Sequence, residues 1–303
     1  MRIKKAGLIS GGLWRLGTEE SCVYLLEGSD SAALISAGLS YILPEYLRQI
    51  ASWGISEKKI AHIIILHAHF DHVGLVPYLK RKSPQVTIHA SSRGWEVLAN
   101  PRAISVMNEY TLKVCNRVQG NTDVLSALDW QWRDDVHGEA LKQGSCIDLG
   151  GRQIEIHETP GHSSCSISIY VPQLKALFPS DAVAIPYQND YVIAAGSSLD
   201  AYQKSLDKLA VLDTEMLCAD HYGYVTGTEA KQYIAQSKRA ASQMIDRLQL
   251  ALRNEGGIER AATQLVNLHF EQRPDYFVHP DILLSTYTQM LKQFVDPSKG
   301  RLT

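Results

Sequence analysis

The fold of this chain is indicated by one stretch, Ile63-Ile64-Ile65-Leu66-His67-Ala68-His69-Phe70-Asp71-His72. Its continuous aliphatic run is typical of a strand that is buried on both faces. Three imidazoles and a carboxylate follow within six positions, and these groups bind transition metals. His67 and His69 can point the same way in an extended segment, whereas Asp71 and His72 turn toward a second point. Since open sheets place their sites at the carboxyl ends of strands, the stretch predicts a metal site there.

Three further candidate ligands follow short β-like segments later in the chain. They are His162 in Thr159-Pro160-Gly161-His162-Ser163, Asp181 in Phe178-Pro179-Ser180-Asp181-Ala182, and His221 in Cys218-Ala219-Asp220-His221-Tyr222-Gly223. A single histidine or aspartate in a loop is usually only solvated. Because all three share the strand-end position of the first cluster, we expect them to complete the same metal site.

Strand-like and helix-like segments alternate through residues 1–227. Apolar runs predict strands at 22–26, 32–35, 63–66, 86–89, 153–157, 166–171, 176–178 and 216–219, and helical spacing predicts helices at 43–51, 73–82 and 199–212. Residues 91–130 are predicted to form a helical insert. In it, Asn100 caps a helix that has Pro101 at its first position and ends at Gly120.

The pattern becomes purely helical after Gly227. Thr228 is predicted to cap a long helix that Gly256-Gly257 ends, and two more helices are expected at 258–270 and 281–294. Their apolar stripes need burial. We therefore expect residues 228–303 to be a C-terminal helical extension that packs on the main domain.

The composition is that of a globular protein with a sizeable core, at 303 residues, 45% hydrophobic and 20% charged. A formal charge of −2 gives no attraction to nucleic acid or to an anionic membrane. The five cysteines are widely spaced without a C-x-x-C motif, so we expect reduced thiols in a cytoplasmic protein. No apolar signal-peptide core follows the basic start, and no apolar run approaches the roughly 18 residues of a membrane span.

Taken in order, the motifs resemble those of the metallo-β-lactamase superfamily. They are an HxHxDH signature at 67–72, the pair Gly161-His162, an aspartate after a strand at Asp181, and a late histidine at His221. The resemblance spans residues 1–227, which it identifies as the catalytic domain. It implies an α+β fold, a four-layer αββα sandwich around two adjacent divalent metal ions.

The resemblance also implies how the ligands are shared between the two ions. By analogy, the first ion is held by His67, His69 and His162, the second by Asp71, His72 and His221, and both are bridged by Asp181. Zinc is the default metal, and iron and manganese are alternatives because mixed histidine and aspartate sites accept all three.

Within the superfamily the chain is similar to thioesterases of the quinolone-signal response, which act on 2-aminobenzoylacetyl-CoA. The total length, the helical extension and the stretches 66–79 and 199–209 carry this similarity. The chain departs from those thioesterases at Ile185, where they have a glutamate, and at Leu283, where they have a pocket histidine. The similarity implies an aryl- or β-ketoacyl-CoA-like thioester substrate and a role in quinolone signal biosynthesis or response, hence in quorum sensing.

Two divalent metals can share one water, lower its pKa toward about 7 and so supply hydroxide at neutral pH. They also polarise the substrate carbonyl and stabilise the oxyanion. We expect Asp71 and Asp181 to orient the hydroxide and one of them to protonate the leaving group. Tyr222, next to a ligand, is the third catalytic candidate. Ser163 and Cys165 lack a Gly-x-Ser-x-Gly elbow and are expected to have supporting roles.

Substrate choice should depend on the walls of the site rather than on the ligands. The candidate wall residues are Phe70, Tyr187, Tyr191, Leu283, Thr286 and Tyr287. An aromatic lining of this kind would suit an aryl or fatty acyl group. The remaining histidines have no partner at ligand spacing and are expected to be surface or core residues: His62, His89, His137, His157, His269 and His279.

The predicted function is therefore a dinuclear-metal-dependent hydrolase of a small-molecule acyl thioester. A lactonase of the acyl-homoserine-lactone type is one alternative, because the same hydroxide attacks any activated ester. The other alternative is a regulatory protein that acts through partner binding, as a homodimer or with another protein, and this alternative is favoured by the surface-rich helical extension.

Overall fold

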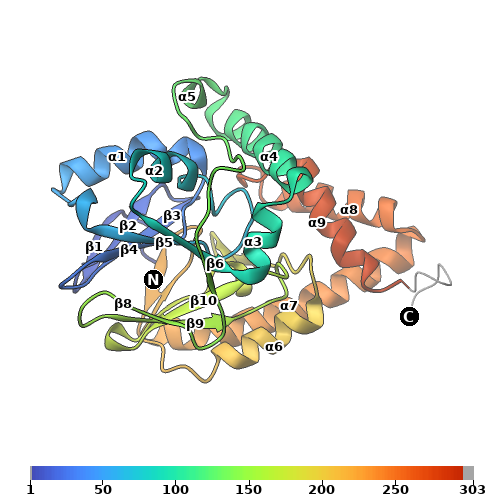
Figure 1. The fold of residues 1–303 in the computed structure, drawn as a ribbon. Helices are drawn as coiled ribbons and strands as arrows, with labels where there is room; N and C mark the ends of the chain where they lie inside the picture. The colour runs from blue at the N-terminus through green and yellow to red at the C-terminus, as the bar shows by residue number, and fades with distance from the viewer. Residues whose placement is uncertain (1, 296–303) are drawn as a thin grey trace.

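Two β-sheets pack face to face, and helices cover their outer faces (Figure 1). The computed structural model describes residues 2–295, so Met1 and the end of the predicted extension, 296–303, lie outside the described residues. The predicted four-layer α+β sandwich is confirmed. Within residues 2–295, none of the helices combines the length and hydropathy that crossing a bilayer requires.

The first sheet has seven strands that lie in chain order. They are β1 (Gly7–Ser10), β2 (Leu13–Gly17), β3 (Cys22–Glu27), β4 (Ala32–Ile35), β5 (Ile60–Ile64), β6 (Thr87–Ser91) and β7 (Glu139–Leu141). β1 to β4 pair antiparallel, whereas β4 to β7 pair parallel. β5 ends at Ile64 rather than at the predicted Leu66. The carbonyl of Leu66 instead accepts a hydrogen bond of 2.8 Å from Ile167 N of the second sheet, which brings the loop after Leu66 to the seam between the sheets.

The second sheet has six strands in the order β15-β14-β11-β10-β9-β8. They are β8 (Cys146–Asp148), β9 (Gln153–Glu158), β10 (Ile167–Val171), β11 (Ala176–Phe178), β14 (Met216–Cys218) and β15 (Tyr224–Thr226). Only β11 and β14 are parallel in this sheet. A separate hairpin consists of β12 (Ile185–Tyr187) and β13 (Asp190–Val192).

Apolar side chains from both sheets form a core between them, which includes Leu26 and Ile35 from the first sheet and Ile169 from the second. Tyr24 and Phe178 meet edge to face across it, with ring centroids 5.3 Å apart. Each fully buried side chain of this size contributes about 1.5–3 kcal/mol to stability. The sandwich therefore gives the loops at the strand ends a rigid support.

Helices of the main domain cover both sheets and form the insert. They are α1 (Leu43–Ser52), α2 (Val76–Lys82), α3 (Ser92–Leu98), α4 (Pro101–Gln119), α5 (Asp123–Ser126) and α6 (Leu199–Leu209). As predicted, Asn100 caps α4, because its side chain accepts hydrogen bonds from the backbone N–H groups of Arg102 and Ala103. Gly120 ends α4 in the left-handed conformation, at φ 75°.

The start of α2 differs from the prediction that Val73 and Gly74 begin a helix. Gly74 N donates to Gly38 O at 2.7 Å, so this segment is a loop that lies against the backbone of residues 38–40. A Cβ atom at position 74 would lie 2.2 Å from Ser40 N. Glycine is required there for close backbone approach, and the helix starts only at Val76.

The extension consists of α7 (Thr228–Glu255), α8 (Ile258–Gln272) and α9 (Pro280–Lys292). The prediction that Thr228 caps α7 is wrong: Gly227 is the N-cap, at φ 58°, and the helix has no side-chain cap bond. α7 contacts α6, β14 and β15. The extension also reaches α4, because Lys113 pairs with Asp281 at 2.7 Å and Arg117 donates to the carbonyl of Tyr276 at 3.0 Å.

Candidate metal centre

Three imidazoles from two loops converge on one point. His67 and His69 lie in the loop after β5, and His162 lies in the loop after β9. The His162 Nε2 atom is 3.2 Å from His67 Nε2 and 2.9 Å from His69 Nδ1, and the latter two nitrogens are 3.1 Å apart. His67 and His162 are buried, whereas His69 is exposed toward the cavity above them.

A second set of donor groups adjoins the first and comprises Asp71, His72, Asp181 and His221, all buried. Asp181 lies in a single 3₁₀ turn, η4 (Ser180–Ala182), after β11. Its carboxylate oxygens are 3.3 Å from His72 Nε2, 3.6 Å from His221 Nε2 and 3.4 Å from His162 Nε2. Asp181 therefore lies between the two sets, and all seven predicted ligands meet although they come from four separate loops.

The donor chemistry of these residues fits divalent metal ions. The Nε2 atoms of His72 and His221 are buried and have no hydrogen-bond partner among the described residues. In the first set, three ring nitrogens face one another within 2.9–3.2 Å, where the lone pairs of neutral imidazoles repel. A cation bound between the nitrogens and carboxylates satisfies all of these groups at once.

The other ring nitrogen of four ligands is held by a hydrogen bond that fixes the orientation of the ring. The partners are Ser180 Oγ for His67 at 3.1 Å, Asp220 Oδ2 for His72 at 2.8 Å, the carbonyl of Ala194 for His162, and the carbonyl of Glu20 for His221 at 2.6 Å.

Asp220 links the two donor sets and was not among the predicted site residues. Its Oδ2 atom accepts from His72 Nδ1 and also from the Ser180 hydroxyl at 2.7 Å, and that hydroxyl in turn contacts His67. The side chain is 2% exposed. The signal in the sequence was its position directly before the ligand His221, because metal-bound histidines commonly donate to a nearby carboxylate.

The loop that holds His162 is itself tied to the extension. Ser197 N and Ser198 N donate to the carbonyl of Gly161 at 3.1 and 2.9 Å. Gln293, just after α9, donates to the carbonyl of Ala195 at 3.0 Å and accepts from Leu199 N at 2.7 Å. The last helix thus helps to position a loop whose Ala194 carbonyl orients a metal ligand.

The electrostatics of the two sets differ. Burial lowers the pKa of His162 to about 4 and, together with neighbouring imidazoles, lowers the pKa of His67 well below its ordinary value. Burial also opposes ionisation of Asp181, but the imidazoles of His72 and His221 outweigh it and hold the pKa of this carboxyl well below its usual range. The first set is therefore neutral at pH 7 and the carboxylate of Asp181 is ionised, as metal ligation requires. Burial opposes protonation of His72 and His221, but the neighbouring carboxylates outweigh it and raise the pKa of both, so a metal ion that binds there displaces protons from these two rings.

A cavity of about 410 Å³ opens above the ligands. Three of the predicted wall residues, Phe70, Leu283 and Thr286, line this cavity. Sequence reasoning missed Tyr110 of the insert, whose ring meets Phe70 edge to face at 5.8 Å, and Ile282 of α9. The walls are therefore built from the insert and the extension, far in sequence from the ligands.

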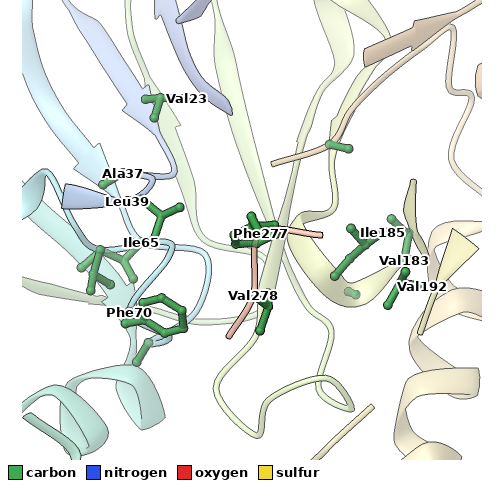
Figure 2. Close-up of a cluster of buried hydrophobic side chains, with 14 of the residues drawn as sticks. Val23, Ala37, Leu39, Ile65, Phe70, Val183, Ile185, Val192, Phe277 and Val278 are labelled. Atoms are coloured by element: carbon green, nitrogen blue, oxygen red, sulfur yellow. The ribbon is translucent and has the colours of Figure 1, made fainter. Parts of the chain in front are cut away.

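Phe277 and Val278, which precede α9, also line this cavity. Figure 2 shows them between two groups of apolar side chains, with Leu39, Ile65 and Phe70 on one side and Val183, Ile185 and Val192 on the other. The Phe277 ring also lies over the imidazole of His221, with centroids 5.0 Å apart. The extension thus places an aromatic ring directly against a predicted metal ligand.

Four other predicted site residues do not line the cavity. Tyr187 and Tyr222 contact each other edge to face at 5.1 Å within an aromatic cluster, Tyr191 packs on Tyr233, and the Tyr287 hydroxyl contacts His269 at 3.2 Å. Through these contacts, the hairpin β12–β13 and α9 pack against neighbouring segments. The catalytic role of Tyr222 stays a prediction, and its side chain does not line the cavity.

Cys165 has contacts that suit the supporting role expected for it. Its sulfur accepts from Ala68 N at 3.4 Å and contacts Ser163 Oγ at 3.0 Å. Cys165 thus joins the loop that holds His67 and His69 to the loop that holds His162. Two of the histidines expected to be surface or core residues, His62 and His89, are hydrogen-bonded to each other at 3.0 Å across β5 and β6. Adjacent parallel strands bring together side chains whose spacing in the sequence reveals nothing.

The sequence of the chain is similar to a known protein family and to several characterised proteins. Residues 17–221 match the family model of the metallo-β-lactamase superfamily. The chain is 25% identical over 203 residues to the acyl-coenzyme A thioesterase MBLAC2 of Gallus gallus, covering 61% of this chain and 68% of that protein. It is 22% identical over 292 residues to the atrochrysone carboxyl ACP thioesterase of Aspergillus fumigatus, covering 91% and 79%.

The fold is also shared with solved structures. A metallo-β-lactamase family protein from Thermus thermophilus superposes with a TM-score of 0.65 at 19% identity, covering 94% of this chain and 95% of that one. This likeness concerns the fold, and it extends through the helical extension as well as the sandwich.

Proposed function

The chain belongs to the metallo-β-lactamase superfamily and is a metal-dependent hydrolase; from this premise we propose that it hydrolyses a small-molecule acyl thioester at two divalent ions. The observation that carries the proposal is the pair of donor sets on either side of Asp181, at the floor of a largely apolar cavity. The two thioesterases among its relatives support the thioester class.

In this proposal the donor sets divide between the ions as the superfamily resemblance implies, with Asp181 shared. Bound divalent ions supply Lewis acidity toward a carbonyl oxygen and lower the pKa of water toward about 7. Zinc is the default, with iron and manganese as alternatives. The tied rings of His67, His72, His162 and His221 hold the donor nitrogens in place without reorganisation.

The carboxylates move the protons of the reaction. Asp71 lines the cavity and is placed to accept a proton from the attacking water. The water oxygen bonds to the thioester carbonyl carbon, the carbon–sulfur bond breaks, and the proton passes from Asp71 to the departing sulfur. The products are a carboxylic acid and a free thiol, so no oxidant, reductant or covalent nucleophile is required.

The cavity walls favour an apolar acyl group. Phe70, Tyr110 and Leu283 face the cavity, and no lysine or arginine lines it among the described residues. The phosphates of a coenzyme A ester would therefore lie outside while the acyl group enters. A place in quinolone-signal metabolism, in the cytoplasm, is the narrower form of this proposal, with an aryl β-ketoacyl group in the cavity.

The test is thiol release from a panel of aryl-, β-ketoacyl- and alkyl-CoA esters, including 2-aminobenzoylacetyl-CoA, with Zn²⁺, Fe²⁺ or Mn²⁺ restored. We expect thiol release that His162→Ala abolishes and that His137→Ala, at an exposed position, leaves unchanged. Opening of acyl-homoserine lactones in a pH-stat without thiol release would instead establish the lactonase. Turnover of neither class by the metal-loaded protein would favour a regulatory protein that binds a partner.

A further inference from the structure

A second cavity, of about 250 Å³, lies among the three helices of the extension. It shares no lining residue with the cavity over the metal ligands. α7 contributes Arg247 to its wall, α8 contributes His269, and Tyr287 comes from α9. Nothing in the proposed hydrolysis uses this cavity.

The wall of this cavity is rich in hydrogen-bond donors and has no acidic member among the described residues. It holds the guanidinium groups of Arg247 and Arg273 and the amides of Asn254, Gln264 and Gln272. Arg273 is paired with Asp190, from outside the wall, whereas no hydrogen bond or ion pair joins the Arg247 side chain to another described residue. The exposed guanidinium of Arg247 therefore has no partner among the described residues and can turn toward a ligand in the cavity.

Two buried nitrogens in the same wall lack a hydrogen-bond partner among the described residues. They are Nε2 of His269, a side chain 3% exposed, and Nε of Arg273, a side chain 6% exposed. Burial lowers the pKa of His269 to about 4, so its ring is neutral at pH 7. The Tyr287 hydroxyl is hydrogen-bonded to His269 Nδ1 at 3.2 Å, and in the tautomer in which that hydroxyl donates, the His269 Nε2 atom carries the hydrogen and is a second unsatisfied donor. A buried N–H group without an acceptor is costly, and an oxyanion supplies acceptors.

The rim of the cavity is apolar and open to solvent. Leu250 is 52% exposed and Leu268 is 42% exposed, and both line the cavity together with Met244 and Leu265. A bare inorganic anion would leave these side chains in water, whereas an alkyl chain attached to the anion would cover them. The lining therefore matches a molecule with an oxyanion at one end and an apolar tail at the other.

We propose that this cavity binds an amphipathic carboxylate, whose carboxylate lies against Arg247 and Arg273 and whose apolar tail covers Leu250 and Leu268. Arg247 supplies the charge-assisted hydrogen bonds because it is free to turn toward the ligand. Arg273 and His269 form the donor-rich floor. Since α9 also forms a wall of the metal cavity, an occupant here stabilises the position of that wall.

The test is calorimetric titration of the full metal-loaded chain with octanoate and, separately, with inorganic phosphate. We expect octanoate to bind and Arg247→Gln to weaken binding about tenfold or more, since hydrogen bonds to charged groups are the strong ones. Arg253→Gln is the matched control on the same helix, because Arg253 is exposed and does not line the cavity. Arg247→Lys keeps the charge and should retain part of the affinity.

Octanoate could also reach the metal ions, and the variants separate the two sites. Binding in the extension survives His162→Ala and weakens in Arg247→Gln, which would support the proposal. Binding that is lost in His162→Ala and unchanged in Arg247→Gln belongs to the metal centre and would overturn it. Phosphate binding as tight as octanoate binding would show that the apolar rim plays no part, and would overturn the assignment to an amphipathic ligand.

Discussion

The floor and the wall of the metal cavity are built in different ways. The floor consists of imidazoles and carboxylates whose orientations are fixed by further hydrogen bonds, such as those of Asp220 and Ser180. The wall includes apolar side chains on α9 and the insert, such as Leu283 and Tyr110, whose positions depend on packing. Hydrogen bonds fix a direction, whereas apolar packing fixes only a volume, so in the proposed reaction the floor determines the chemistry and the wall determines which acyl group fits.

The largest difference between floor and wall is expected at the carboxylate between the two donor sets. In Asp181→Ala, both sets lose a shared ligand, and we expect weaker retention of metal and thioester hydrolysis lower by about 1000-fold or more. Metal content after dialysis and the initial rate measure this. Asp134→Ala removes an exposed carboxylate and should change neither quantity. Full activity of the Asp181 variant would remove this residue from the reaction.

A smaller effect on metal affinity is expected for the residues that hydrogen-bond to the ligands from behind the metal site. Asp220→Asn keeps the shape of the side chain but weakens the acceptor that orients His72 and, through Ser180, His67. Partners of this kind change metal affinity by about 10–100-fold. Competition for Zn²⁺ against a chelator measures the affinity, and denaturation of the metal-free variant shows whether the fold is retained. Unchanged affinity in a folded variant would mean that these hydrogen bonds do not orient the rings.

The wall should affect selectivity while leaving the metals in place. Leu283→Ala removes apolar surface from the cavity, and we expect kcat/KM for an apolar acyl thioester to fall about tenfold with metal content unchanged. Leu284→Ala is the matched control, because Leu284 is 38% exposed on the same helix and does not line the cavity. Equal effects of the two substitutions would mean that the helix acts through stability alone.

The smallest effect is expected where the wall is tied to the floor. Gln293→Ala removes the side chain that holds Ala195 and Leu199, and so loosens the loop whose Ala194 carbonyl orients His162. Because the residue acts at one remove from the ligand, we expect metal affinity to fall about two- to fivefold, less than for a direct partner of a ligand. The same chelator competition applies, with Lys292→Ala as the control. An effect as large as that of Asp220→Asn would place the wall and the floor in one rigid unit.

The ligands could be predicted from the sequence because their signal is local. His67, His69, Asp71 and His72 lie within one loop, and a dense group of histidines and aspartate directly after an aliphatic strand is typical of a metal site. The wall could not be predicted in the same way. Tyr191 and Leu283 are both apolar candidates near turns or helix faces, yet only Leu283 lines the cavity, because the hairpin of Tyr191 packs on α7.

The amino-acid sequence by itself determined the cluster of candidate ligands after a strand, the caps at Asn100 and Gly120, and the helical character of the extension, since each depends on neighbours a few positions away. Only the tertiary structure decided that Asp220 joins the two donor sets, that Gly74 serves a loop rather than a helix, and that Arg273 pairs with Asp190. These contacts join residues tens of positions apart. Their partners are chosen by how sheets and helices pack, which local patterns in the chain do not encode.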